Sequence, residues 1–109
     1  MKKVIIESPY AGDTMANIEY ARQCIKDSIR RGESPIASHL LYTQPGILDD
    51  DNPAERDQGI AAGLAWLEVA DLHAFYIDNG ISYGMECAMK MSLEMGYNIE
   101  LRILEKPEG

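Results

Sequence analysis

Apolar and polar residues follow one another along the chain in blocks that predict strands and helices in turn. Residues 3–7 form a short run rich in β-branched side chains and closed by Ser8-Pro9, which is typical of a buried strand. Residues 17–31 place apolar side chains on one helical face. Arg30 and the following Gly32 match the usual end of a helix, so this part of the chain predicts a strand followed by an amphipathic helix.

The rest of the chain continues this alternation. Residues 35–42 predict a second strand, which runs into an acidic loop over residues 43–51. Residues 52–69 begin with asparagine, proline and a nearby glutamate, which together favour the start of a helix. The remaining predicted elements are a strand over 72–77, a helix over 82–95 closed by Gly96, a strand over 98–104 and a frayed tail over 105–109.

The alternation predicts one domain over residues 1–109 with a three-layer α/β fold. We expect four or five mostly parallel strands with helices on both faces of the sheet. Right-handed crossovers bring the carboxyl ends of parallel strands to one edge, and ligands bind where the strand order reverses. The residues at these predicted ends are Ser8 to Tyr10, His39 and Asp78 to Gly84. The pattern therefore predicts a small-molecule site at this edge.

Composition and charge exclude several classes of partner. The 18 acidic residues outnumber the 10 basic ones and give a formal charge of −8, with lysine and arginine scattered along the chain. This balance argues against binding to nucleic acid or to an anionic membrane. No apolar run approaches the ~20 residues of a membrane span, and the opening residues lack the apolar core of a signal peptide. We therefore expect a cytoplasmic location.

The sequence predicts neither a metal site nor a cofactor. Cys24 and Cys87 lie far apart and are expected to be free thiols. His39 and His73 are the two histidines, and local spacing assembles no zinc-type cluster from these four residues. The phosphate-binding patterns G-x-x-x-x-G-K-[ST] and G-x-G-x-x-G are also absent from the sequence.

Three residues are candidates for chemistry, and each has a structural alternative. Glu86 falls in the first turn of the third predicted helix, where it either stabilises the helix start or acts as a nucleophile on an anomeric carbon. Tyr10 either packs in the fold or lines a base pocket beside the nucleophile. Asp78 either forms a turn or hydrogen-bonds a sugar or a base.

Further candidates for ligand binding surround these three residues. His39 either binds ligand or is a satisfied structural histidine beside Leu40, and Asp57 is a solvated helix residue unless it belongs to a site. The full set of candidate ligand-binding residues is Ser8, Pro9, Gly12, Asp13, His39, Arg56, Asp57, Asn79, Gly80, Ser82 and Gly84.

Two segments of the sequence carry a family resemblance. Ser8-Pro9-Tyr10-Ala11-Gly12-Asp13 and Gly80-Ile81-Ser82-x-Gly84-Met85-Glu86 resemble segments of the nucleoside 2-deoxyribosyltransferase-like superfamily. The chain looks most like a subgroup of small phage and bacterial proteins, which share its Pro35-x-x-x-His39-Leu-Leu-Tyr segment. The resemblance implies a flavodoxin-like domain and a retaining mechanism. In this mechanism a glutamate attacks C1′ of a 2′-deoxynucleoside, and another base or water then takes the sugar.

The resemblance also implies roles for individual residues. Glu86 matches the nucleophile by position, and Tyr10 matches the tyrosine that orients it. Asp78 lies near the place of an aspartate that contacts the sugar or base, and Asp57 is a candidate for the aspartate that handles proton transfer to the base. Members of the superfamily commonly complete each pocket with a neighbouring subunit, so the resemblance implies a homo-oligomer.

Two functions remain open at this point. The first is an enzyme, either a deoxyribosyltransferase or an N-glycosidase, that acts at the N-glycosidic bond of a nucleoside or nucleotide. The second is a non-catalytic protein that sequesters a nucleotide-derived signalling molecule. An example would be a phage anti-defence protein in the host cytoplasm that binds a cyclic ADP-ribose isomer. A proton donor separates the two, because a binding protein needs Tyr10 and a polar pocket but no aligned acid.

Overall fold

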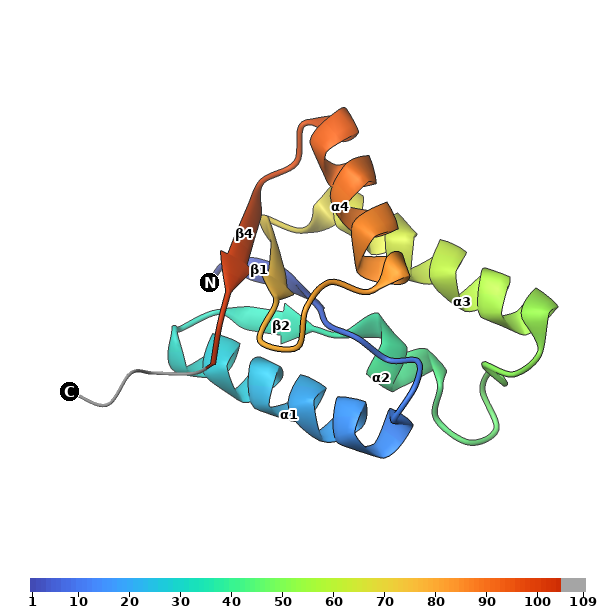
Figure 1. Ribbon diagram of the computed structural model, residues 1–109. Helices are drawn as coiled ribbons and strands as arrows, with labels where there is room; N and C mark the ends of the chain where they lie inside the picture. The colour runs from blue at the N-terminus through green and yellow to red at the C-terminus, as the bar shows by residue number, and fades with distance from the viewer. Residues whose placement is uncertain (105–109) are drawn as a thin grey trace.

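The computed structural model describes residues 1–104 and alternates strands with helices along the chain (Figure 1). Its elements are β1 (Lys3–Glu7), α1 (Thr14–Arg30), β2 (Ser34–Ile36), α2 (Ser38–Tyr42), α3 (Pro53–Ala65), the 3-10 helix η1 (Trp66–Val69), β3 (Leu72–Tyr76), α4 (Tyr83–Met95) and β4 (Ile99–Arg102). This order confirms the α/β fold class. The expected tail over residues 105–109 lies outside the described residues. No helix within residues 1–104 is long and apolar enough to cross a membrane.

The four strands form one sheet in the order β2-β1-β3-β4, and every neighbouring pair is parallel. The chain leaves β1 through α1 to reach β2 on one side, and β3 then pairs with β1 on the other side. The strand order therefore reverses between β1 and β3. Ligands of open α/β sheets bind beyond the carboxyl ends of the strands at such a point.

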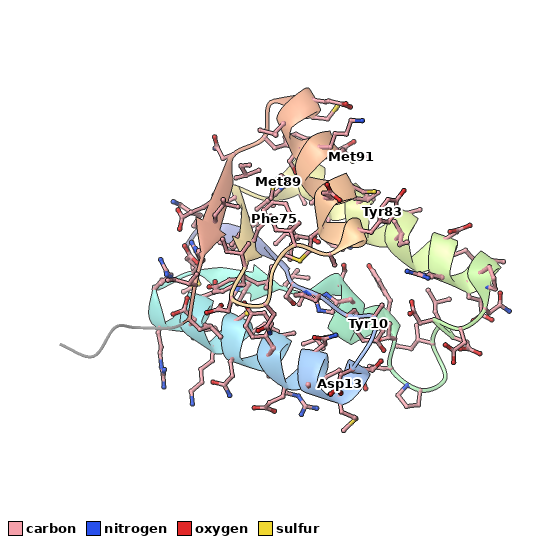
Figure 2. The ribbon with its side chains drawn as sticks, in the orientation of Figure 1. Tyr10, Asp13, Phe75, Tyr83, Met89 and Met91 are labelled. Carbon is pink, nitrogen blue, oxygen red and sulfur yellow. The ribbon has the colours of Figure 1, made fainter. Side chains whose placement is uncertain are left out.

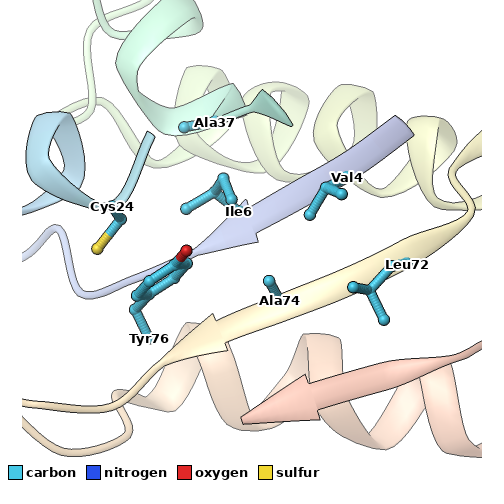
Figure 3. Packing of buried hydrophobic residues seen from close by; sticks show 7 residues of the cluster. All are labelled: Val4, Ile6, Cys24, Ala37, Leu72, Ala74 and Tyr76. Carbon is cyan, nitrogen blue, oxygen red and sulfur yellow. The ribbon is translucent and has the colours of Figure 1, made fainter. Parts of the chain in front are cut away.

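Helices cover both faces of the sheet, so the fold has three layers. Ile6 of β1 packs with Tyr76 of β3 against Cys24 of α1 on one face, in the cluster that Figure 3 shows. Phe75 of β3 packs against Met85 of α4 on the other face. Figure 1 accordingly shows α1 and α4 on opposite sides of the strands. Successive strand residues alternate between the faces, so Glu7, which follows Ile6, belongs to the face of α3 and α4.

Capping side chains fix where the three longer helices begin. Asp13 Oδ1 accepts from the Ala16 amide at 3.2 Å, and Asn52 Oδ1 accepts from the Ala54 amide at 3.0 Å. Ser82 Oγ accepts from the Met85 amide at 3.3 Å. Each such cap contributes ~1 kcal/mol to helix stability. These local signals explain why α1, α3 and α4 begin within a few residues of where the sequence predicts them.

The prediction of a strand over residues 35–42 is confirmed at Pro35 and Ile36 and is wrong for residues 38–42. The strand ends at Ile36, and residues 38–42 form the short helix α2. A short apolar run does not distinguish a strand from a helix, and tertiary contacts decide between them here. Gly63 of α3 allows α2 to approach closely, since a Cβ at this position would lie 2.6 Å from Ser38 Oγ. The predicted helix over residues 52–69 is also divided, because its last turn is the 3-10 helix η1.

Candidate functional site

A cavity of about 670 Å³ lies beyond the carboxyl end of β1, between α2, α3 and the start of α4. Its size falls within the ~300–1,000 Å³ typical of small-molecule sites. Glu7 and Ser8 at the end of β1 contribute to its lining, together with Ser82 and Met85 at the start of α4. The cavity therefore lies at the edge of the sheet where the parallel fold predicts a site. A second hollow of about 630 Å³ adjoins it over the acidic loop and shares Tyr10 with it.

Ser8, His39 and Tyr10 form one connected group in the wall of the cavity. His39 Nε2 lies 3.2 Å from Ser8 Oγ, and the rings of His39 and Tyr10 meet edge to face with centroids 5.8 Å apart. Burial lowers the pKa of His39 to about 4, so its imidazole is neutral at pH 7. A neutral imidazole offers one donor and one acceptor, which suits hydrogen bonding to uncharged ligand groups.

The loop that carries Tyr10 is held in place by the first turns of α1. Asn17 Nδ2 donates to the carbonyl oxygen of Tyr10 at 3.0 Å and to that of Ala11 at 2.9 Å. Figure 2 shows Tyr10 beside α2, with Tyr83 above it at the start of α4. Both tyrosines line the cavity, and Tyr83 is 80% exposed. The cavity thus presents aromatic rings from two separate segments of the chain.

Glu7 is a cavity residue that the sequence analysis did not find. It is the last residue of β1, its side chain is partly buried, and it lines the cavity. Burial raises the pKa of its carboxyl from 4.5 to about 7. Within the described part of the chain, this carboxyl makes no hydrogen bond or ion pair. A glutamate at the end of an otherwise apolar buried strand is the sequence signal that points to it.

The cavity is acidic. Among the described residues that line it, five carry carboxyl groups and one carries a guanidinium group. The carboxyl groups belong to Glu7, Asp50, Asp51, Glu55 and Asp57, and the guanidinium group belongs to Arg56. A lining of this charge disfavours anionic ligands and accommodates neutral or cationic ones.

The structure brings half of the candidate site residues together at the cavity. Those that line it are Ser8, Tyr10, His39, Arg56, Asp57, Ser82 and Gly84. The others lie outside its lining: Glu86, Asp78, Pro9, Gly12, Asp13, Asn79 and Gly80. Asp13 serves instead as the cap of α1, and Gly12 and Gly80 occupy turns at positive φ angles of 96° and 87°.

Glu86 and Asp78, the expected catalytic carboxylates, do not reach the cavity. Glu86 is exposed on α4, next to Met85, whose side chain packs against the sheet. Asp78 accepts a hydrogen bond of 2.5 Å from the Tyr20 hydroxyl, and both of its carboxylate oxygens lie 3.0 Å from the Leu104 amide that donates to them. Asp78 therefore connects α1 to the segment that follows β4. The sequence analysis places Tyr10 beside the nucleophile, but Glu86 is not among the residues that line the cavity with Tyr10.

The two cysteines and the two histidines lie in different parts of the fold. Cys24 is buried and Cys87 is exposed, and both are free, as the sequence predicts. Cys87 lines the cavity, as does His39, whereas His73 is a buried residue of β3 with Nδ1 2.5 Å from Ser92 Oγ. Within residues 1–104, no group of three or more His, Cys, Asp or Glu side chains could hold a metal ion.

The fold and the placement of the cavity define an α/β domain with the fold of the nucleoside 2-deoxyribosyltransferases. The chain superposes on the 2-deoxyribosyltransferase of the psychrotolerant bacterium Bacillus psychrosaccharolyticus with a TM-score of 0.66 and 18% sequence identity, over 97% of this chain and 77% of that one. That enzyme is described as a biocatalyst for the synthesis of antiviral and antitumoral nucleosides. Residues 2–102 match the model of a family described as a domain of unknown function, DUF7768, and the chain belongs to this family. No curated protein matches the chain.

Proposed function

We propose that the chain binds an uncharged nucleoside in the cavity beyond β1 and acts at its N-glycosidic bond. The observation that carries this proposal is a cavity of about 670 Å³ at the carboxyl end of β1 in a deoxyribosyltransferase-like fold. The residues of the cavity support it, because they combine aromatic and apolar surface with polar groups that can form hydrogen bonds. Sites for small organic ligands have this composition.

The lining offers aromatic surface for a base and hydrogen-bonding groups for a sugar. Tyr10 and Tyr83 present rings on which a planar base can stack, and Leu64 adds apolar surface to the lining. Ser8, Ser82 and the neutral imidazole of His39 provide hydrogen-bonding groups for sugar hydroxyls. This division matches the two halves of a nucleoside.

The charge of the lining favours a nucleoside over a phosphorylated ligand. Arg56 is the sole cation among the described residues that line the cavity, and it stands beside Glu55 and Asp57 in α3. Phosphate groups are commonly recognised by arginine side chains, and the described lining contains a single one, Arg56. The same argument disfavours the sequestering function, because a cyclic ADP-ribose isomer carries two phosphates.

The cavity is exposed along α3 and α4, and we propose that a second copy of the chain covers it. Ile60 of α3 is 51% exposed and Tyr83 of α4 is 80% exposed, although both line the cavity. Trp66, the first residue of η1, is a further aromatic side chain that is 45% exposed. Aromatic side chains are enriched where subunits meet. Light scattering should give a mass above the 12.2 kDa of one chain.

The proposed activity can be tested with a panel of nucleosides, 2′-deoxynucleosides, nucleoside monophosphates, NAD and cyclic ADP-ribose isomers. Calorimetry would measure binding, and chromatography would measure the free base. We expect binding and base release for an uncharged nucleoside. Tight binding of a phosphorylated compound without base release would support sequestration instead, and the absence of binding to every member would contradict the proposal. Glu86→Gln should retain base release, since Glu86 lies outside the lining of the cavity.

A further inference from the structure

The carboxyl group of Glu7 enters the cavity at the point where the strand order reverses. Glu7 is paired in register with Phe75 of β3, and Phe75 packs on the face of the sheet that α4 covers. Ile6, its neighbour in β1, packs on the opposite face. The alternation of β1 therefore directs Glu7 toward α3 and α4, into the space that also contains Ser82 and Met85.

No structural interaction within residues 1–104 accounts for a buried carboxyl at this position. The carboxyl of Glu33, in contrast, accepts hydrogen bonds of 2.8 and 2.7 Å from Arg102, and the side chain of Glu33 is 11% exposed. Glu7 has no comparable partner among the described residues, and burial without a partner destabilises a charged group. An unpaired carboxyl in a ligand-sized cavity indicates a role toward the ligand.

Burial, and not a neighbouring ionisable group, sets the pKa of Glu7 in the cavity. The groups that share the cavity are the neutral His39 of α2, Asp50 and Asp51 of the acidic loop, and Glu55, Arg56 and Asp57 of α3. Tyr10, Tyr42, Tyr83 and Cys87 add further ionisable side chains. Burial is the cause that raises the pKa of Glu7 to about 7, so its acid and its base forms coexist at neutral pH. A group with such a pKa is suited to both donating and accepting a proton.

We propose that Glu7 is the acid–base group of the cavity, an inference that rests on the proposed function. Its carboxyl donates a proton to the departing base, and its carboxylate then accepts a proton from the water that replaces this base. In the first step the C1′–N bond breaks, its electron pair goes to the base, and the Glu7 proton moves to a base nitrogen. In the second step the water oxygen bonds to C1′, and the water proton returns to Glu7. The balance is nucleoside plus water giving free base plus free sugar.

The test compares Glu7→Gln with the parent chain on two leaving groups. One substrate is the best nucleoside of the panel, whose base needs a proton to depart. The other is the 4-nitrophenyl glycoside of the same sugar, whose leaving group departs unprotonated. Loss of a general acid costs about 10²–10⁴-fold in rate. We expect Glu7→Gln to lose this factor on the nucleoside but to stay within about tenfold of the parent on the 4-nitrophenyl glycoside.

Two controls make the outcomes separable. Glu94→Gln changes an exposed glutamate of α4 outside the cavity lining and should match the parent on both substrates. The parent itself should lose activity on the nucleoside as pH rises through about 7, and Glu7→Gln should show no such decline. The pH profile of the parent's activity requires no substitution, so it still tests the role of Glu7 if Glu7→Gln fails to fold.

Each contrary result has a distinct meaning. A Glu7→Gln variant that releases base at the parental rate overturns the role of Glu7 and leaves the proposed function standing. Equal loss on both leaving groups in a folded variant overturns the role of Glu7 as the acid, because a missing acid spares the 4-nitrophenyl glycoside. A parent whose rate does not fall through pH 7 also overturns this role. A parent that releases no base from any member of the panel overturns both the proposed function and the role of Glu7.

Discussion

His39 Nε2 lies 3.2 Å from Ser8 Oγ, which joins α2 to the residue that directly follows β1. This contact matters because α2 has five residues, and a helix of that length is not stable alone. Trp66 Nε1 donates to the Tyr42 hydroxyl at 3.0 Å and holds the other end of α2. The wall that α2 gives to the cavity therefore depends on contacts from distant parts of the sequence.

The close approach of α2 to α3 predicts that Gly63→Ala is destabilising. The added Cβ would lie 2.6 Å from Ser38 Oγ and 3.1 Å from Ser38 Cβ, so Ser38 must shift. Overpacking of this kind costs about 1–3 kcal/mol, and urea denaturation would measure it. The matched control is Gly84→Ala, where a Cβ meets no atom within 4 Å. Equal stability of the two variants would show that α2 does not depend on this contact.

The buried imidazole of His39 predicts a dependence of stability on pH. Burial lowers its pKa from 6.5 to about 4, so the unfolded chain takes up the proton first as pH falls. This contribution to stability is present above pH 6.5 and is lost as pH falls toward 4. His39→Gln should therefore shrink the loss of stability between pH 7 and pH 5 by about 2 kcal/mol. Urea denaturation at several pH values would check it, and parallel curves for parent and variant would contradict it.

The ion pair between Arg102 and Glu33 predicts a second acid-sensitive contribution. The side chains are 3% and 11% exposed, and the hydrogen bond from Arg102 holds the pKa of Glu33 below its usual value of 4.5. This contribution is present above pH 4.5 and is lost as pH falls through the lowered pKa. Glu33→Gln should cost about 3 kcal/mol at pH 7 because it leaves Arg102 buried without its full partner.

An exposed ion pair of the same chain provides the control for this prediction. Glu19 and Arg22 lie 3.7 Å apart with side chains 60% and 66% exposed. Exposed pairs contribute little, so Glu19→Gln should change the free energy of unfolding by less than about 1 kcal/mol. If the two variants lost equal stability, burial would not be what strengthens the pair of Arg102 and Glu33.

The elements with strong local signals could be predicted from the sequence, and those set by tertiary contacts could not. Asp13, Asn52 and Ser82 mark the starts of α1, α3 and α4 because a cap acts on amides two or three residues away. Residues 38–42 lack such a signal, and the contact of α2 with Gly63 decides their structure.

The candidate site could likewise be predicted from the sequence only in part. The location of the cavity follows from the alternation of parallel strands, but the side chains within it depend on which face each element presents. Successive residues of a helix point about 100° apart, so Glu86 is exposed although Met85 packs against the sheet. Glu7 was missed for a related reason, because its burial comes from the packing of α3 and α4 over the end of β1.

The burial of Glu7 predicts that Glu7→Gln is more stable than the parent in weak alkali. Its pKa rises from 4.5 to about 7 on folding, so the folded chain keeps a proton that the unfolded chain has already released. The stability of the parent is therefore lost as pH rises from 4.5 through 7. Glu7→Gln removes this loss and should gain about 3 kcal/mol over the parent at pH 8, with a much smaller difference at pH 5. Urea denaturation of both chains at pH 5, 6.5 and 8 would measure the gain, with the exposed Glu94→Gln as the control that shows none. A gain in stability together with a loss of base release would identify Glu7 as a residue kept for activity at the expense of the fold, whereas equal stability of parent and variant at pH 8 would contradict its burial.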